Sequence, residues 1–345
     1  MESLLINLTK TVHELPNLYK DDNFYIMKNI AVIEGGYSHE KIISLKSADT
    51  VFQNIDRTKY IPIKVRIDEE GWFAYEGDEK IEINRNDFSF NNTHFDLAFI
   101  VIHGTPGEDG KLQAYFDMVG IPYTTCSQLA ATLTFNKFVC NQYLKNFGIN
   151  VADAVLIRQN EKIDSNSIIN QVGLPCFVKP ADGGSSFGIT KVKEESTLEA
   201  AIQLALEHGT QAIIESFMQG REVTNGIYKN KSGIINLPVT EIISENDFFD
   251  YDAKYKGESK EETPANIAEE LTLKIKSTTR KIYEVLDLRG ICRADFIIQN
   301  NEPYLIEINS VPGQSAQSII PQMAAHEGIS LKQLFDEVIE VAIMK

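Results

Sequence analysis

The residue types best suited to chemistry lie in a stretch that begins at Arg293, where Asp295, Glu307 and Asn309 recur at strand spacing. Alternating runs on either side of residues 300–302 predict a β-hairpin with a three-residue loop. In that register Asp295 faces Glu307 across the two strands. Arg293 faces Asn309 on the same side, at the open end of the hairpin. The opposite face then takes apolar side chains that we expect in a core: Ala294, Phe296, Ile298, Tyr304, Ile306 and Ile308.

Two carboxylates and an amide oxygen on one sheet face are hard ligands of the kind that Mg²⁺ prefers, with water and phosphate completing its shell. The neighbouring Arg293 would stabilise charge that develops on a substrate oxygen. The alternative is a structural network of arginine and carboxylates at the end of a strand. The hairpin alone leaves both interpretations open.

A second stretch suited to an anion is the loop from Gly183 to Gly188, which follows a predicted strand ending at Lys179. Its glycines let successive backbone N–H groups turn toward one anion, and Ser185 and Ser186 add hydroxyl donors. A Walker A loop would carry its lysine after the second glycine and lead into a helix. Here the lysine lies upstream and a strand follows. The pattern predicts a phosphate cradle between two strands, with a surface turn as the alternative.

Composition excludes several classes of protein. A chain of 345 residues suggests two or three domains, and 43% hydrophobic with 24% charged residues is typical of a globular protein. A net charge of −16 without a basic cluster argues against a nucleic-acid partner, and no apolar run approaches the ~20 residues of a membrane span. Four dispersed cysteines without a C-x-x-C motif favour buried free thiols and a reducing cytoplasm.

The first part of the chain predicts an open parallel α/β unit, with strands at 29–34, 60–67 and 95–102 and a helix from about Ser38. Glu40, in the first helical turn, would bind a substrate ammonium or only complement the helix dipole. A glycine-rich loop after the third strand carries two polar residues that would touch a ligand or stabilise the loop: His103 and Glu108. The dinucleotide fingerprint G-x-G-x-x-G is missing after the first strand, so NAD binding is poorly supported.

Further along, residues 128–146 predict one long helix that carries Lys137. A capping box at 196–199 predicts the start of another helix. The charged, aperiodic stretch 244–266 predicts a lid or a disordered segment. The remaining predictions are strands at 151–157, 173–180, 189–192, 211–218, 223–228 and 237–243, and helices at 112–119, 267–286, 317–326 and 331–343.

This set of motifs resembles the ATP-grasp superfamily and, within it, the D-alanine–D-alanine ligase family. The motifs occur in the family's order over about residues 28–345: Gly35-Gly-Tyr-Ser-His-Glu40 with Ser44-Leu45, His103-Gly-Thr-Pro-Gly-Glu-Asp-Gly110, Lys179-Pro with Gly184-Ser-Ser-Phe-Gly188, Tyr251-Asp-Ala-Lys-Tyr255, Gly290-Ile-Cys-Arg-Ala-Asp295 and Glu307-Ile-Asn-Ser-Val-Pro-Gly313. Each motif is weak evidence by itself, whereas six in register are strong. Gln314 and the pair Ser310-Val311 depart from the family's usual pattern, which concerns the geometry of the second substrate site.

The resemblance implies an α/β fold in which an N-terminal open parallel α/β (pre-ATP-grasp) domain at 27–126 precedes a two-lobed ATP-grasp fold. The central lobe would span 127–213, and the C-terminal lobe would span 214–345 with the lid loop at 244–266. Residues 1–26 match nothing in the family core and are predicted to be an N-terminal extension, either an appended segment or an upstream start before a natural one at Met27.

The resemblance also implies the reaction, in which ATP and two D-alanines give D-alanyl-D-alanine, ADP and phosphate through an acyl phosphate. The product would serve peptidoglycan precursor synthesis in the cytoplasm. Implied partners and cofactors are ATP, D-alanine, two Mg²⁺ or Mn²⁺ ions and a second copy in a homodimer, with no nucleic acid and no membrane.

The family's functional positions carry over to this chain residue by residue. The resemblance implies catalytic roles for Glu40, Ser185, Tyr255, Arg293 and Gly313. It implies ATP contacts for Lys137, Lys179, Ser185, Ser186, Glu215, Phe217, Met218, Glu222 and Lys254. Amino-acid substrate contacts are implied for Glu40, His103, Arg293, Gly313, Ser318 and Ile319, and metal ligation for Asp295, Glu307 and Asn309.

Two other functions stay open at this stage. One is an ATP-grasp ligase that joins a different amino acid, and the other is a non-catalytic nucleotide-binding protein of the same fold. A protein of the second kind should have lost a metal ligand or a phosphate lysine. This chain keeps all five of them: Lys137, Lys179, Asp295, Glu307 and Asn309.

Overall fold

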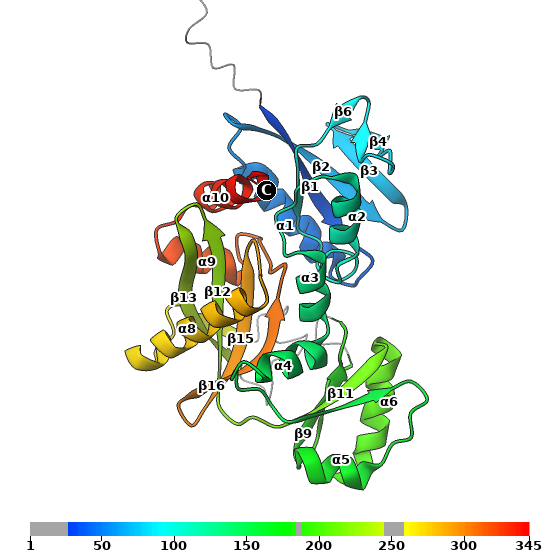
Figure 1. Ribbon diagram of the computed structural model, residues 1–345, viewed down its shortest axis with the longest axis vertical. Helices are drawn as coiled ribbons and strands as arrows, with labels where there is room; N and C mark the ends of the chain where they lie inside the picture. Colours follow the sequence, from blue (N-terminus) through cyan, green and yellow to red (C-terminus); the bar gives the residue numbers. More distant parts are fainter. Residues whose placement is uncertain (1–26, 184–187, 245–258, 345) are drawn as a thin grey trace, which may run out of the picture.

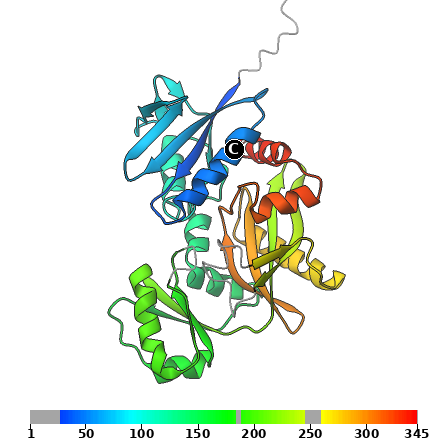
Figure 2. The same cartoon turned by 180° about the vertical axis from the view of Figure 1, so that it is seen from behind.

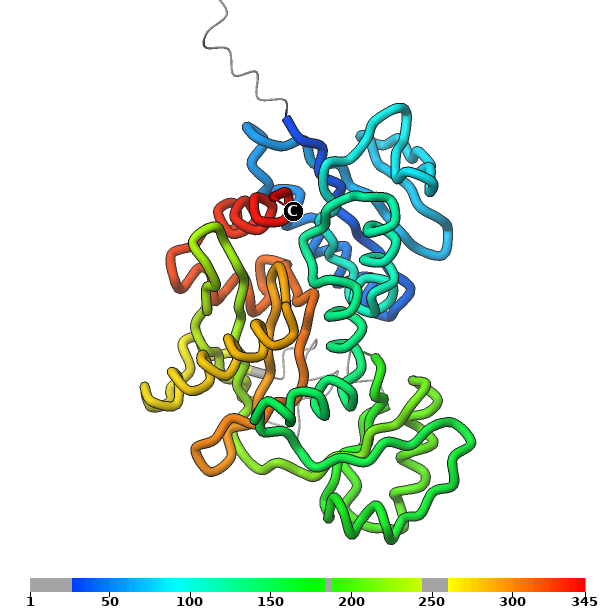
Figure 3. Tube along the Cα trace, viewed as in Figure 1, coloured from blue at the N-terminus to red at the C-terminus, as the bar shows by residue number. Residues whose placement is uncertain are grey.

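The computed structural model describes residues 27–183, 188–244 and 259–344. Figure 3 follows the chain from an N-terminal body through two short helices to a central body, and then into the C-terminal sheet. The predicted α/β fold class is confirmed. The N-terminal and C-terminal sheets fall within the predicted segments 27–126 and 214–345, whereas the last strand of the central sheet, at 211–216, runs past the predicted end of the segment 127–213. The domain boundaries themselves stay predictions.

The N-terminal sheet has the strand order β4-β3-β2-β1-β7. Strands β2, β1 and β7 are parallel as predicted, whereas the unpredicted hairpin of β3 and β4 extends the sheet antiparallel, so the sheet is mixed. β1 is buried on both faces because helices cover the two sides, which explains its continuous apolar run. The elements are β1 Lys28–Gly35, α1 Lys41–Asn54, β2 Tyr60–Asp68, β3 Gly71–Glu76, β4 Glu79–Glu82, β5 Ser89–Phe90, β6 Thr93–His94, β7 Leu97–Ile100 and α2 Lys111–Val119.

Between the N-terminal and central bodies, two helices replace the single helix predicted over 128–146 (Figure 1). The backbone at Asn136 is extended, and its side chain accepts from the Val139 N–H and so caps the second helix. The single-helix prediction was wrong because a capping residue inside the apolar pattern starts a new helix. The two helices are α3 Gln128–Phe135 and α4 Lys137–Lys145.

The central body is a small sheet of order β10-β9-β11-β8 covered by α5 and α6. The predicted capping box at 196–199 is wrong, because a 3-10 turn at Glu195–Thr197 precedes α6 and no side chain caps that helix. The elements are β8 Ala154–Arg158, α5 Ser165–Val172, β9 Cys176–Pro180, β10 Thr190–Val192, α6 Leu198–His208 and β11 Gln211–Ser216.

The C-terminal sheet has the order β14-β13-β12-β15-β16. Helix α8 covers one face, and α9 with α10 covers part of the other, as the two opposite views show (Figures 1 and 2). β14 lies within the segment predicted as a lid loop, 244–266, so residues 259–262 form a strand and not a loop. Residues 245–258 lie outside the described residues, and the lid itself stays a prediction. The elements are β12 Arg221–Asn230, β13 Gly233–Ser244, β14 Ser259–Glu262, α8 Glu269–Val285, β15 Cys292–Gln299, β16 Glu302–Asn309, α9 Ile319–His326 and α10 Leu331–Ile343.

The hairpin of β15 and β16 corrects one prediction. Its loop has two residues, Asn300 and Asn301, both at positive φ (54° and 60°), as a tight hairpin turn requires. A bulge after Asp295 adds one residue to β16, which restores the predicted pairing of Asp295 with Glu307. Beyond the bulge Leu305 is fully buried in the core, in place of the predicted Tyr304 and Ile306.

The N-terminal and C-terminal parts share a core. Residues of β1, β7 and α1 pack with α9 and α10 in one apolar cluster, and α10 lies beside α1 in both ribbon views (Figures 1 and 2). The shared core fixes the N-terminal sheet against the C-terminal sheet. All four cysteines are buried and free, as predicted: Cys126, Cys140, Cys176 and Cys292.

Candidate active site

A groove of about 780 Å³ lies where the three bodies meet. Its walls come from α1 and the loop after β7, from α4 and the central sheet, and from the face of the C-terminal sheet opposite α8. Every described residue with a predicted functional role lines it: Glu40, His103, Lys137, Lys179, Glu215, Phe217, Met218, Glu222, Arg293, Asp295, Glu307, Asn309, Gly313, Ser318 and Ile319. Four predicted residues lie outside the described residues: Ser185, Ser186, Lys254 and Tyr255.

The floor of the groove is the polar face of β15 and β16. Arg293 donates from Nε and Nη2 to the two oxygens of Asp295, each at 2.8 Å, and only 11% and 12% of these side chains are exposed. Asp295 also accepts from Asn309 Nδ2 at 2.9 Å and from the Thr224 hydroxyl at 2.5 Å. Thr224, on β12, was not predicted, although strand alternation would have placed it on this face.

Lys137 faces the floor from the first turn of α4, where the cap at Asn136 starts the helix. Its ammonium lies 3.3 Å from Glu307 Oε2 and donates to the Gly183 carbonyl at 2.6 Å. Lys137 therefore joins the floor to the start of the glycine–serine loop. An ammonium group between Glu307 and the start of the glycine–serine loop is suited to bind an anion, such as a phosphate, in the groove.

Lys179 and Glu215 form a buried ion pair on adjacent strands of the central sheet, with 2.6 Å between Nζ and Oε2. Burial alone would lower the pKa of Lys179, but Glu215, Glu307 and Glu222 outweigh it and raise that pKa above its ordinary value. The ammonium therefore stays charged in the groove. Burying an ion pair costs desolvation free energy, so a pair this buried is more often kept to bind a ligand or to fix a geometry than to stabilise the fold.

An aromatic wall closes the groove beside this pair. The rings of Phe177 and Phe217 lie 5.9 Å apart, and the Lys191 ammonium lies 4.3 Å from the centre of the Phe217 ring. Lys191 follows the glycine–serine loop on β10 and was not predicted. Flat apolar surface with a nearby cation suits a heteroaromatic ring.

The opposite end of the groove is acidic. Glu40 precedes α1, and Glu108 accepts from the N–H groups of Gly104 at 2.7 Å and Val311 at 3.2 Å. Burial and the charge of Glu40 raise the pKa of Glu108 to about 8 in spite of these two donors. An ammonium group that enters here would favour the ionised form of Glu108 and pair with the acidic end of the groove.

The turn after β16 leads from the floor to α9. A Cβ atom at Gly313 would lie 2.8 Å from the Ser318 hydroxyl, so the backbone of the turn passes directly against this side chain. The Ser315 and Ser318 hydroxyls are 2.7 Å apart. The start of α9 thus offers hydroxyl and backbone N–H groups to a small carboxylate.

The predicted metal ligands fit a hard cation in the type of their donors. Asp295 and Glu307 are paired across the strands, and Asn309 lies at the same end of the hairpin. Arg293 and Lys137 balance their charge in the structure. The described residues contain no cluster of three or more His, Cys, Asp or Glu side chains placed to bind a metal, so a site here depends on the Asn309 amide.

Two family models match the chain: the N-terminal part of D-alanine–D-alanine ligases at residues 29–126 and their C-terminal part at residues 143–340. The chain is 48% identical to a D-alanine–D-alanine ligase of Flavobacterium johnsoniae, over 92% of this chain and 100% of that protein. It is 47% identical to one of Parabacteroides distasonis, over 91% and 97%. The chain belongs to the D-alanine–D-alanine ligase family.

Solved structures of this ligase family share the fold. The VanG D-Ala:D-Ser ligase of Enterococcus faecalis is 34% identical with a TM-score of 0.84, over 92% of this chain and 99% of that one. A D-alanine–D-alanine ligase of Bacillus anthracis, solved with ATP, is 25% identical with a TM-score of 0.76, over 92% and 98%. No helix in the described part of the chain is long and apolar enough to cross a membrane.

Proposed function

We propose that this groove joins two D-alanine molecules at the expense of ATP, giving D-alanyl-D-alanine, ADP and phosphate for peptidoglycan precursor synthesis. The observation that carries the proposal is the meeting in one groove of the charged hairpin floor with two lysines from other elements, Lys137 and Lys179. Membership of the ligase family supports the same reaction.

The nucleotide occupies the end of the groove between the central sheet and the floor. Lys137 and Lys179 hold its phosphates together with the loop that contains Ser185 and Ser186, because lysines supply mobile point charges. Lys254 adds a further charge. The adenine and ribose are bordered by Glu215, Phe217, Met218 and Glu222.

Asp295, Glu307 and Asn309 would hold two Mg²⁺ or Mn²⁺ ions, whose charge would replace the balance that Arg293 and Lys137 provide in the structure. The bound metal supplies neutralisation of phosphate charge during phosphoryl transfer. With a cation on Asp295, the Arg293 guanidinium would be able to donate to a substrate oxygen as well.

The first D-alanine binds with its ammonium at Glu40 and near His103. Its carboxylate attacks the γ-phosphorus, ADP leaves, and the acyl phosphate forms. The amine of the second D-alanine, whose carboxylate lies at Ser318 and Ile319, loses a proton and attacks the acyl carbon, and phosphate leaves. Arg293 and the Gly313 N–H stabilise the intervening oxyanion. Two residues link Glu40 to the loop and lid: Ser185 and Tyr255.

A second candidate is a ligase that takes D-serine as the second amino acid. The observation in its favour is the 34% identity to the D-Ala:D-Ser ligase of Enterococcus faecalis. The groove end near Ser315 and Ser318 offers hydroxyls that would also accept a serine side chain. We favour D-alanine because the relatives with higher identity carry that name.

Phosphate release with ATP and Mg²⁺, measured for single amino acids and their mixtures, tests the proposal. D-alanine alone should support turnover and yield the dipeptide by mass spectrometry. Turnover that requires D-serine would select the second candidate. Turnover with L-alanine but not D-alanine would overturn both, and nucleotide binding without turnover would indicate a non-catalytic protein.

We further propose that the protein acts as a homodimer in the cytoplasm, where its nucleotide substrate is available. Sedimentation velocity over a range of protein concentrations checks the dimer. A single species at the monomer mass throughout the range would contradict it.

A further inference from the structure

The turn from Val311 to Gln314 belongs to the C-terminal sheet, yet it is held by side chains of the N-terminal body. His103 Nδ1 lies 2.8 Å from the Val311 carbonyl oxygen. The Ser47 hydroxyl accepts from the Gln314 N–H at 3.1 Å and lies 3.4 Å from His103 Nε2. Both side chains are buried, so water competes little for these contacts.

The chemistry of the partners fixes the direction of each hydrogen bond. A carbonyl oxygen only accepts, so His103 Nδ1 carries the proton that faces Val311. Ser47 accepts from the Gln314 N–H, which leaves its own proton for His103 Nε2. The bonds therefore run in one direction, from the Gln314 amide through Ser47 and His103 to the Val311 carbonyl. A neutral imidazole satisfies all of them.

A hydrogen bond between two residues of the turn itself also stabilises its backbone. The Gln314 side chain, which is buried, donates from Nε2 to the Pro312 carbonyl at 3.1 Å. Glu108 adds a further contact at the Val311 N–H. Gly313 lies between these fixed points, with its backbone against Ser318. The direction of its N–H is therefore set by contacts at both ends of the turn.

We infer that Ser47 and His103 are positioning residues that hold the backbone of Gly313 for the oxyanion formed in the ligase reaction. The inference rests on the proposed function and adds to it a pair of residues that act through the turn. Ser47 lies on α1, the helix that Glu40 precedes. Helix α1 would thus help to position both Glu40, for the first substrate's ammonium, and the Gly313 N–H, which donates to the oxyanion oxygen on the reacting carbon.

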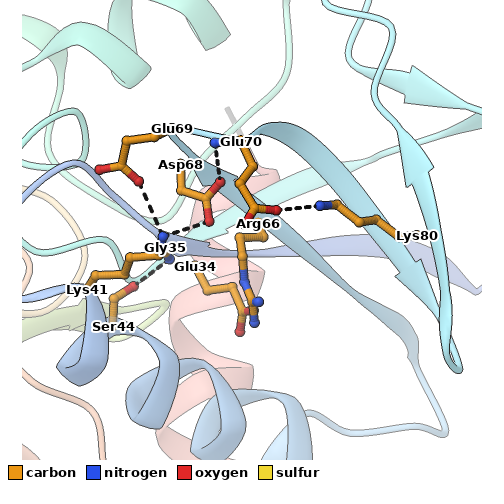
Figure 4. A network of polar contacts seen from close by, with 9 residues as sticks. All are labelled: Glu34, Gly35, Lys41, Ser44, Arg66, Asp68, Glu69, Glu70 and Lys80. Atoms are coloured by element: carbon orange, nitrogen blue, oxygen red, sulfur yellow. Dashed lines mark hydrogen bonds and ion pairs between the residues drawn. The ribbon is translucent and has the colours of Figure 1, made fainter.

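The structure supplies a matched control for Ser47. Ser44 is one turn earlier on α1, is equally buried, and accepts from the Gly35 N–H at 3.0 Å within the N-terminal body, as Figure 4 shows. We expect Ser47→Ala to lower kcat on the order of 10- to 100-fold, because a small misplacement of an oxyanion donor is costly. The KM for ATP should stay unchanged. Ser44→Ala should lower the melting temperature similarly and keep kcat within about twofold of wild type.

His103 provides an independent test, because Asn reaches as far as Nδ1 and Gln as far as Nε2 of the ring. If His103 positions the turn, His103→Asn keeps the donor to Val311 and retains more kcat than His103→Gln. If His103 instead contacts substrate through Nε2, His103→Gln retains more. A higher kcat in His103→Gln than in His103→Asn would therefore overturn the positioning role.

The outcomes separate this inference from the proposed function. A wild-type protein without ligase activity defeats the proposed function. An active wild type in which Ser47→Ala and Ser44→Ala lose the same kcat defeats the positioning role alone. A rise in the KM for ATP with kcat unchanged in Ser47→Ala does so as well.

Discussion

The hairpin floor and the turn that follows it are adjacent in the chain but are built in opposite ways. The floor places Arg293, Asp295 and Asn309 by pairing two neighbouring strands, and its main contacts join residues 2 and 14 positions apart. The turn is held by His103 and Ser47, which lie 208 and 267 positions away from their partners. Local register therefore determines one half of the site, and the packing of two bodies determines the other.

The difference predicts how each half fails. A change in the floor should remove charge or a ligand at the reacting groups and leave the fold intact, because the paired strands are stabilised by their apolar face. A change at the turn should affect stability and geometry together, because its contacts connect two parts of the molecule.

The largest effect should come from the floor. Glu307→Gln removes a carboxylate that faces Lys137 at 3.3 Å, and we expect kcat to fall on the order of 10³-fold. Stability should change by about 1 kcal/mol, because glutamine keeps the size of the side chain and an oxygen that can accept from Lys137. Phosphate release and urea unfolding measure the two quantities. Retained turnover would return Glu307 to a purely structural role.

Arg293→Lys should have the next largest effect. Lysine keeps the charge but cannot reproduce the two-point contact with Asp295, so we expect kcat to fall about 10²-fold. Arg66→Lys is the control, because Arg66 pairs with buried Glu34 away from the groove (Figure 4). Arg66→Lys should lower the free energy of unfolding and leave kcat unchanged. Equal losses of kcat in the two variants would contradict a special role for Arg293.

Sequence reasoning succeeded where a pattern of local spacing carries the structure. The pairing of Asp295 with Glu307 and of Arg293 with Asn309 followed from strand alternation, even though the loop length was wrong and a bulge compensated for it. Periodicity also predicted α10, whose bounds are those expected. All the described residues to which the family resemblance assigns a role lie in the one groove.

Sequence reasoning failed where long-range packing or a single residue decides. The break between α3 and α4 depends on the Asn136 cap, which the apolar period concealed. Nothing in local spacing indicates that Ser47 accepts from Gln314, because that contact exists only once α1 packs against the C-terminal part. The roles of His103 and Glu108 stayed open for the same reason.

A smaller effect concerns the pH dependence of stability at the turn. The pKa of Glu108 is about 8 in the folded protein, above the ordinary 4.5. Between these values the folded state keeps a proton that the unfolded chain has lost, so stability falls as pH rises from about 5 to 8. The slope from this group is at most about 1.4 kcal/mol per pH unit.

Glu108→Gln removes the titrating group, so its unfolding free energy should vary less over the same window. Urea unfolding of both proteins at several pH values measures the difference. Parallel curves for the two proteins would show that Glu108 is already ionised in the folded state.

The smallest effect tests whether the floor is locally determined. Asn301 has φ 60° in the two-residue loop, which asparagine tolerates and alanine does not. Asn301→Ala should cost about 1 kcal/mol of stability, and Asn301→Gly should be neutral or slightly stabilising. Neither should change kcat, because the bulge after Asp295 and the pairing with β12 hold the floor in register. A loss of kcat in Asn301→Ala without loss of stability would mean that the loop sets the register of the floor. The positions of Asp295 and Asn309 would then depend on the whole hairpin and not only on the strand pairing around them.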